Sequence, residues 1–157
     1  MKWIDLRTLA TVTPQAVIKK LKGRYAMKSN NQPPLVMVAD RDSVERAQLK
    51  AVLKLKGFRV IEAAQGPQAI ALAMDYRPDL LLLDLKLPKL RSSEAIWMIR
   101  REPSLRRMPI IAVSDSHHGR LPLDSRTVHA SRPIEYTQLD RLLTQFLQKP
   151  LFLSAAS

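Results

Sequence analysis

Short apolar runs that alternate with helix-like segments constrain the fold of this chain more than any other feature. The runs span residues 35–39, 58–63, 80–84, 110–114 and 127–131. The third run, LLLLD, has four consecutive leucines without alternation, which is typical of a parallel strand buried on both faces. We therefore expect a sheet whose strands are joined through crossover helices.

The segments between these runs have the start and stop signals of helices. Residues 42–45 (Asp42-Ser-Val-Glu45) have the spacing of a capping box, and Gly57 would end the helix that follows. Gly66-Pro67 opens a second helix, which ends before Pro78. A third helix is predicted over residues 93–101 and a last, amphipathic one over residues 135–148.

This alternation predicts an α/β fold, a doubly wound, five-stranded parallel sheet with helices on both faces. The expected strand order is the flavodoxin-like 2-1-3-4-5. Between Ser114 and Thr127 the sequence reads DSHHGRLPLDSR, in which Gly119 and Pro122 interrupt any regular helix. The fourth crossover is therefore expected to be shortened or irregular.

Composition limits the class of protein. The 157 residues, 46% of them hydrophobic, suffice for one domain and an appendage. There is no cysteine, which fits a reducing compartment. No apolar stretch approaches the length of a membrane span, and the N-terminus lacks the apolar core of a signal peptide. We expect a cytoplasmic protein without a membrane span.

The net charge of +12 is concentrated at the N-terminus. Residues 1–34 contain seven basic and one acidic side chain, a net charge of +6 and half of the excess. Residues 27–34 are polar and end in two prolines, which predicts a linker. The expected division is a basic arm and linker over 1–34, a folded domain over 35–149 and a tail over 150–157. A start of the true product at Met27 remains open.

Polar residues stand at three of the predicted strand ends: Asp40, Asp84 and Ser114. The carboxyl ends of parallel strands meet at one edge of a sheet, where ligands bind. Two carboxylates placed together repel each other, and a hard divalent cation such as Mg²⁺ relieves the repulsion. Such a site suits phosphoryl transfer to a carboxylate, with Arg132 as an additional cation. For Asp84 alone, a role as a simple turn cap also remains open.

The order and spacing of four segments resemble the response regulator receiver domain of two-component signalling. These segments are LVMVADRD (35–42), PDLLLLDLKLP (78–88), IRREPSLRRMPIIAVS (99–114) and SRP (131–133). The resemblance extends from residue 35 to about residue 148. It implies a phosphodonor, which is a histidine kinase or a phosphotransfer protein, and a downstream protein target.

The resemblance also implies residue roles. Asp84 matches the aspartate that accepts the phosphoryl group, and Asp40 matches a Mg²⁺ ligand. The backbone carbonyl of Lys86 matches the third protein ligand of the metal, and Ser114 matches the switch hydroxyl that turns toward the phosphoryl group. Arg132 takes the place of a lysine whose following proline is usually joined by a cis peptide bond.

Some positions depart from the family pattern. Ala39 replaces the first acid of an acidic pair, so we expect weak Mg²⁺ binding. Arg132 brings a planar guanidinium where the family has a compact ammonium. His129 falls where a Tyr or Phe normally couples phosphorylation to the output face, and Arg91-Ser92 replaces an Asp-Gly turn. Each departure affects one step of the mechanism.

The leading hypothesis is a stand-alone receiver that is not an enzyme beyond its own phosphorylation and that signals by protein contact. One alternative is a pseudo-receiver, which keeps the fold as an interaction module and is not phosphorylated. Another is a polyanion- or nucleic-acid-binding protein that uses the basic arm and the arginines at 100, 101, 106 and 107, although the arm lacks interleaved aromatic residues.

Two further residue pairs have ordinary structural explanations. His117-His118 has no carboxylate or cysteine at ligand spacing, which favours a solvated loop. Trp97 and Met98 lie among apolar residues of the third predicted helix, and core packing is expected to explain at least one of them.

Overall fold

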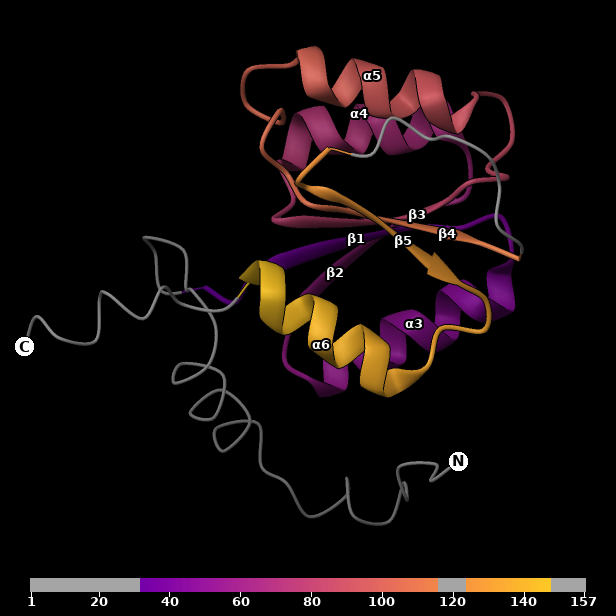
Figure 1. Ribbon diagram of the computed structural model, residues 1–157, viewed down its shortest axis with the longest axis vertical. Coiled ribbons are helices and arrows are strands. Elements are labelled where there is room, and N and C mark those ends of the chain that lie inside the picture. The colour runs from indigo at the N-terminus through magenta and orange to yellow at the C-terminus, as the bar shows by residue number, and fades with distance from the viewer. Residues whose placement is uncertain (1–31, 116–123, 148–157) are drawn as a thin grey trace, which may run out of the picture.

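The computed structural model describes residues 32–115 and 124–147 (Figure 1). Its elements are β1 (Leu35–Ala39), α3 (Ser43–Leu55), β2 (Arg59–Ala63), α4 (Gly66–Tyr76), β3 (Leu80–Asp84), α5 (Ser92–Arg101), β4 (Ile110–Ser114), β5 (Thr127–Ser131) and α6 (Tyr136–Leu147). The predictions for most of the basic arm, the tail and the histidine pair lie outside the described residues. No helix within the described ranges has the length and apolar character needed to cross a bilayer.

The five strands form one parallel sheet in the order β2-β1-β3-β4-β5, which confirms the flavodoxin-like order. Helices α4 and α5 cover one face of the sheet, and α3 and α6 cover the other (Figure 1). In the fourth crossover, the described residues 115 and 124–126 form no helix. The remainder of that crossover, residues 116–123, lies outside the described part of the chain, so its shape stays a prediction.

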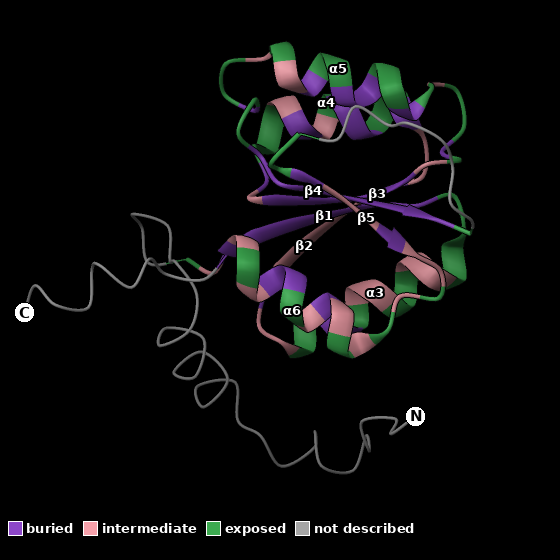
Figure 2. Cartoon of the chain, viewed as in Figure 1, coloured by how far each residue is buried: buried purple, intermediate pink, exposed green. Residues whose placement is uncertain are grey.

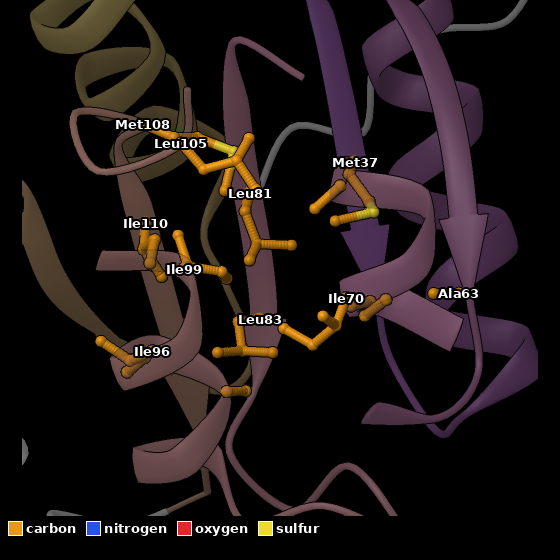
Figure 3. Packing of buried hydrophobic residues seen from close by; sticks show 14 of the residues in the cluster. Met37, Ala63, Ile70, Leu81, Leu83, Ile96, Ile99, Leu105, Met108 and Ile110 are labelled. Atoms are coloured by element: carbon orange, nitrogen blue, oxygen red, sulfur yellow. The ribbon is translucent and has the colours of Figure 1, made fainter. Parts of the chain in front are cut away.

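Both faces of the central strands are buried, which explains the unbroken leucine run. Strands β1, β3 and β4 are buried at every position (Figure 2). Leu81 and Leu83 pack into the cluster beneath α4 and α5 (Figure 3), whereas Leu80 and Leu82 belong to the cluster on the opposite face. Each leucine that is fully buried in this way contributes roughly 1.5–3 kcal/mol. The strand is therefore packed on both faces and buried up to its last residue, Asp84.

Core packing does not explain Trp97 or Met98, so that expectation is wrong. Helix α5 buries Ile96 and Ile99, whereas Trp97 and Met98 are 58% and 37% exposed. Each residue of a helix turns about 100° from the last, which carries both side chains away from the sheet. The guanidinium of Arg101 lies 4.7 Å from the centre of the Trp97 ring, in a cation–π contact.

Arg100, one of the four arginines at 100, 101, 106 and 107, does not simply point into solvent. Its Nη1 donates a hydrogen bond to the carbonyl of Met108 at 2.8 Å, and its Nη2 donates to the hydroxyl of Thr127 at 2.8 Å. Its Nε lies 2.5 Å from the carboxylate of Asp124. Arg100 therefore joins the end of α5 to the start of β5, which is a structural role.

Asp42 caps α3, but the reciprocal bond of a capping box, from the Asp42 N–H to the Glu45 carboxylate, is not formed. Both groups bond to other residues instead. The Asp42 carboxylate accepts hydrogen bonds from the N–H groups of Val44 and Glu45, as the capping box predicts. The Glu45 carboxylate pairs with Arg132, and the N–H of Asp42 donates to the Asp40 carboxylate. The start of α3 therefore contacts Asp40 and Arg132, which follow β1 and β5.

Replacing Asp42 by alanine should destabilise the protein at neutral pH, because α3 loses its cap. Hydrogen bonds from the N–H groups of Glu45 and Val44 hold the pKa of the Asp42 carboxyl below its ordinary value. Its stabilising effect is therefore complete above the pKa of the unfolded chain, about 3.9, and is lost as the pH falls through the lower pKa of the folded protein. Urea unfolding of both proteins across this range checks the prediction, and a stability difference that does not shrink in acid would contradict it.

Candidate functional site

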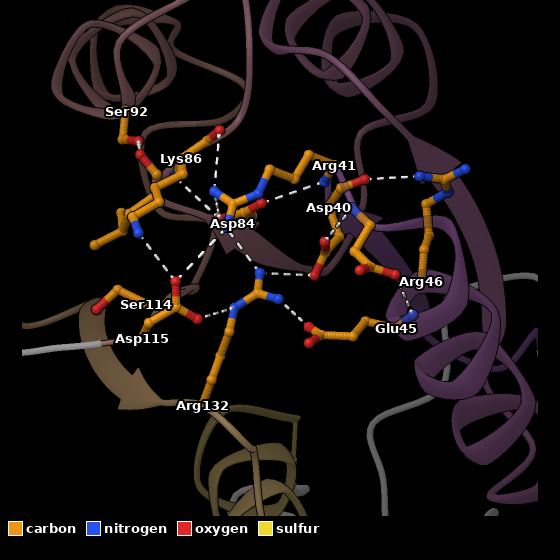
Figure 4. A network of polar contacts seen from close by, with 12 residues as sticks. Asp40, Arg41, Glu45, Arg46, Asp84, Lys86, Ser92, Ser114, Asp115 and Arg132 are labelled. Atoms are coloured by element: carbon orange, nitrogen blue, oxygen red, sulfur yellow. Dashed lines mark hydrogen bonds and ion pairs between the residues drawn. The ribbon is translucent and has the colours of Figure 1, made fainter.

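The polar residues predicted for the site lie together at the carboxyl edge of the sheet (Figure 4). Asp40 follows β1, Asp84 ends β3 and Ser114 ends β4, and all three residues are buried. Strand β3 pairs with both β1 and β4, which brings these three strand ends next to one another. The sheet therefore positions two buried carboxylates and one hydroxyl at a shared edge.

Arg132 follows β5 and joins the two buried carboxylates. Its Nη2 lies 2.9 Å from Oδ2 of Asp40 and 3.3 Å from Oδ1 of Asp84. Its Nη1 pairs with the Glu45 carboxylate, and its Nε lies 3.7 Å from Oδ1 of Asp115. The Arg132 side chain is only 8% exposed, and its peptide bond to Pro133 is cis, as the resemblance implies. One buried guanidinium thus contacts four carboxylates.

The Asp84 carboxylate is also held by the backbone. The N–H of Lys86 donates to Oδ1 at 2.9 Å, and the N–H of Arg41 donates to Oδ2 at 3.2 Å. The Arg41 side chain, which is partly exposed, also contacts Asp84, with Nη1 3.7 Å from Oδ1. Both oxygens of Asp84 are therefore oriented by donors that do not depend on a ligand.

Burial and neighbouring charges act against each other on two groups of the site, and both pKa values end up raised. Burial raises the pKa of the Asp40 carboxyl, and the hydrogen bond from Asp42 and the charge of Arg132 only partly offset it. Burial acts to lower the pKa of the Arg132 guanidinium, but the negative charges of Asp40, Asp84 and Glu45 outweigh burial and raise it. Arg132 is therefore a permanent positive charge at this edge.

Ser114 is hydrogen-bonded to His129, with Oγ and Nε2 2.7 Å apart. His129 pairs with Ala112 in the sheet register, and Ser114 lies two residues further along β4 on the same face. The histidine that takes the position of the usual aromatic residue is thus in direct contact with the predicted switch hydroxyl. Which of the two groups donates the proton depends on the tautomer of the histidine ring.

Reasoning from the sequence missed three residues of this cluster: Arg41, Glu45 and Asp115. Arg41 follows Asp40 and Asp115 follows Ser114 in the sequence. Their positions next to predicted site residues could have indicated that they belong to the site. Lys86 Nζ lies 3.1 Å from Oδ2 of Asp115, which adds a second cation near Asp84. Glu45 gave no such signal, because its partner Arg132 is 87 residues away in the chain.

The chemistry of the donor set fits Mg²⁺. Asp40, Asp84 and the carbonyl of Lys86 supply oxygen ligands, which Mg²⁺ prefers. Arg132 contacts both carboxylates, and Arg41 contacts both Asp84 and the Lys86 carbonyl, so the oxygens surround one small region. Within residues 32–115 and 124–147, no group of three His, Cys, Asp or Glu side chains is placed to hold a metal. A cation here would therefore need the Lys86 carbonyl as its third protein ligand.

The sequence matches a family model and known proteins. Residues 36–132 match the family model of the response regulator receiver domain. The polar-differentiation response regulator DivK of Brucella anthropi is 29% identical over 82 residues, which cover 52% of this chain and 67% of that protein. DivK of Brucella ovis is 28% identical over 79 residues, which cover 50% of this chain and 64% of that protein. The chain thus spans about two thirds of the length of these relatives.

Solved structures show the same fold. The receiver domain of the sensor histidine kinase PA1611 from Pseudomonas aeruginosa, which holds a magnesium ion in its active site cleft, is 27% identical, with a TM-score of 0.67 over 73% of this chain and 97% of that one. The receiver domain of Ssk1 from Saccharomyces cerevisiae, solved with the phosphotransfer protein Ypd1, is 19% identical, with a TM-score of 0.64 over 73% and 89%. Because the family model matches more than half of the chain, this protein belongs to the response regulator receiver domain family of two-component signalling.

Proposed function

We propose that this receiver accepts a phosphoryl group on Asp84 from the phosphohistidine of a histidine kinase or phosphotransfer protein. The observation that carries the proposal is the setting of Asp84 at the end of β3. Its side chain is 1% exposed, two backbone N–H groups orient it, and Arg132 Nη2 lies 3.3 Å from Oδ1. A carboxylate that is oriented and placed beside a fixed positive charge is suited to attack phosphorus.

In the proposed step, a carboxylate oxygen of Asp84 forms a bond to phosphorus while the phosphorus–nitrogen bond of the donor breaks. The donor imidazole leaves with the electron pair of that bond and takes up a proton. Arg132 can then stabilise the negative phosphoryl oxygens. Of the described residues, Arg132 has a buried Nε without a hydrogen-bond acceptor, and a phosphoryl oxygen would supply one.

Mg²⁺ is part of the proposal. Asp40, Asp84 and the carbonyl of Lys86 would hold the ion, and the magnesium in the cleft of the PA1611 receiver domain supports this assignment. When bound, the ion would neutralise negative charge on the phosphoryl oxygens. We propose weak binding, because Ala39 contributes no carboxylate to the site.

The proposal extends to partners and location. The Ssk1 receiver domain was solved with a phosphotransfer protein, and we propose a donor of that class or a histidine kinase here. We further propose that phosphorylation is relayed by contact with a downstream protein and that the chain has no enzymatic activity beyond its own phosphorylation. A cytoplasmic location is proposed as well, which the lack of cysteine supports.

Intact-mass spectrometry after incubation with acetyl phosphate and Mg²⁺ tests the proposed phosphorylation. The expected product carries the mass of one phosphoryl group, and a sample without the phosphodonor is the control. A receiver of established activity, treated in parallel, shows that the conditions permit labelling. An unchanged mass under those conditions would contradict the proposal and favour the pseudo-receiver.

A further inference from the structure

The Arg41 side chain contacts the oxygens that a bound cation would need. Its Nη1 lies 3.5 Å from the carbonyl oxygen of Lys86 and 3.7 Å from Oδ1 of Asp84 (Figure 4). Its Nη2 lies 3.6 Å from Oδ2 of Asp115. Two of the three oxygen donors in the proposed metal site are therefore shared with one guanidinium nitrogen.

The third donor also has a guanidinium partner, but the two arginines differ in their freedom to move. Asp40 is bonded to Arg132, which is 8% exposed and is held by four carboxylates. The Arg41 side chain is 37% exposed, and among the described residues its ion pairs are those with Asp84 and Asp115. Of the two arginines, Arg41 is thus the one that can leave the site toward solvent.

The charges of the cluster favour an exchange of cations over their coexistence. At neutral pH the carboxylates of Asp40, Glu45, Asp84 and Asp115 oppose the cations Arg41, Lys86 and Arg132, which leaves four minus three, or one net negative charge. Adding a divalent ion would make the cluster net positive. The ion would also lie beside the Arg41 guanidinium, which contacts the same oxygens. Removing Arg41 from the site relieves both effects.

We propose that Arg41 is a built-in competitor of the divalent cation, so that Mg²⁺ binds only as the Arg41 guanidinium leaves Asp84 and Lys86. This inference rests on the proposed function, because it concerns the metal site of the same reaction. Weak Mg²⁺ binding would then have a second cause beside Ala39. That cause is the Arg41 side chain, which can be replaced without removing a metal ligand. The affinity of the site for Mg²⁺ is then set by a side chain rather than by the carboxylates alone.

Calorimetric titration of Mg²⁺ into the wild type, Arg41→Gln and Arg46→Gln tests the inference. Arg46 is a matched control, because it carries the same charge at the same edge but contacts the Asp40 carbonyl and Glu62 rather than a proposed metal donor. Arg41→Gln should bind Mg²⁺ about tenfold more tightly, the scale expected when a unit charge beside a divalent ion is removed from a partly exposed site. Arg46→Gln should change the affinity by less than about threefold.

Thermal unfolding provides a second readout that does not depend on phosphorylation. Because a ligand of the folded state stabilises it, Mg²⁺ should raise the Tm of Arg41→Gln more than that of the wild type. Equal tightening in Arg41→Gln and Arg46→Gln would assign the effect to net charge and overturn the inference. Unchanged or weaker binding by Arg41→Gln, or no Mg²⁺ binding by any of the three proteins, would also overturn it.

The phosphoryl adduct separates failure of this inference from failure of the proposed function. An adduct on the wild type without tighter Mg²⁺ binding by Arg41→Gln would contradict the inference and leave the proposed phosphorylation in place. Tighter Mg²⁺ binding by Arg41→Gln without an adduct on the wild type would support the competition and contradict the proposed phosphorylation.

Discussion

Replacing Arg132 by alanine should lower the free energy of unfolding by about 3 kcal/mol, the scale for removing one partner of a buried ion pair. The Arg132 side chain is buried against Asp40 and Asp84, which are themselves buried. Its loss leaves two buried carboxylates close together without the positive charge that offsets their mutual repulsion. Urea unfolding followed by circular dichroism at neutral pH measures the effect.

Arg107→Ala is the control for this experiment, because Arg107 is exposed in the loop before β4. It should change the stability by less than about 0.5 kcal/mol. Adding Asp40→Asn to Arg132→Ala should recover part of the loss, because one of the two carboxylates that have lost Arg132 is then neutral. A loss below about 1 kcal/mol for Arg132→Ala would show that the contacts of Arg132 contribute no more than an exposed ion pair.

Replacing Asp84 by asparagine should abolish the phosphoryl adduct that acetyl phosphate gives on the wild type. A carboxamide has nearly the shape of the carboxylate but is not a nucleophile toward phosphorus. The amide oxygen can still accept one of the two backbone hydrogen bonds, from Lys86 or Arg41, so the fold should be retained. Intact-mass spectrometry of both proteins measures the difference.

Asp115→Asn is the matched control for Asp84→Asn. Asp115 belongs to the same cluster and contacts Lys86, Arg41 and Arg132, but it is half-exposed and does not end a buried strand. It should still be labelled. An adduct on Asp84→Asn equal to that on the wild type would contradict the assignment of Asp84, whatever the behaviour of Asp115→Asn.

The sheet was predictable because its signals are local. The runs LVMVA, LLLLD and IIAVS correspond to β1, β3 and β4 residue for residue, since strands buried on both faces are apolar up to the residue at the sheet edge. Their ends then placed Asp40, Asp84 and Ser114 at one edge without any knowledge of long-range contacts. Which residues of a helix face the core was harder to predict. Trp97 shows this, because an apolar residue in an amphipathic helix need not face the core.

The ion pairs at the site could not be predicted, because they join segments that are far apart in the sequence. Glu45 had the spacing of a capping box, but the structure pairs its carboxylate with Arg132 across 87 positions. The sequence placed Arg132 at the site but did not show that one guanidinium would contact both Asp40 and Asp84. Likewise, the side chain of Arg41 could have pointed to solvent, and only the fold shows that it turns toward Lys86.

Mapping the phosphorylated residue is the experiment on which the proposed function depends. Borohydride reduces an aspartyl phosphate to homoserine, and peptide mass mapping of the treated protein then locates the modified position. We predict homoserine at position 84 alone, because Asp84 is the carboxylate that ends β3 with both oxygens oriented by backbone N–H groups. Modification at Asp40 or Asp115, or no modification in a sample that gives the intact-mass adduct, would contradict Asp84 as the acceptor.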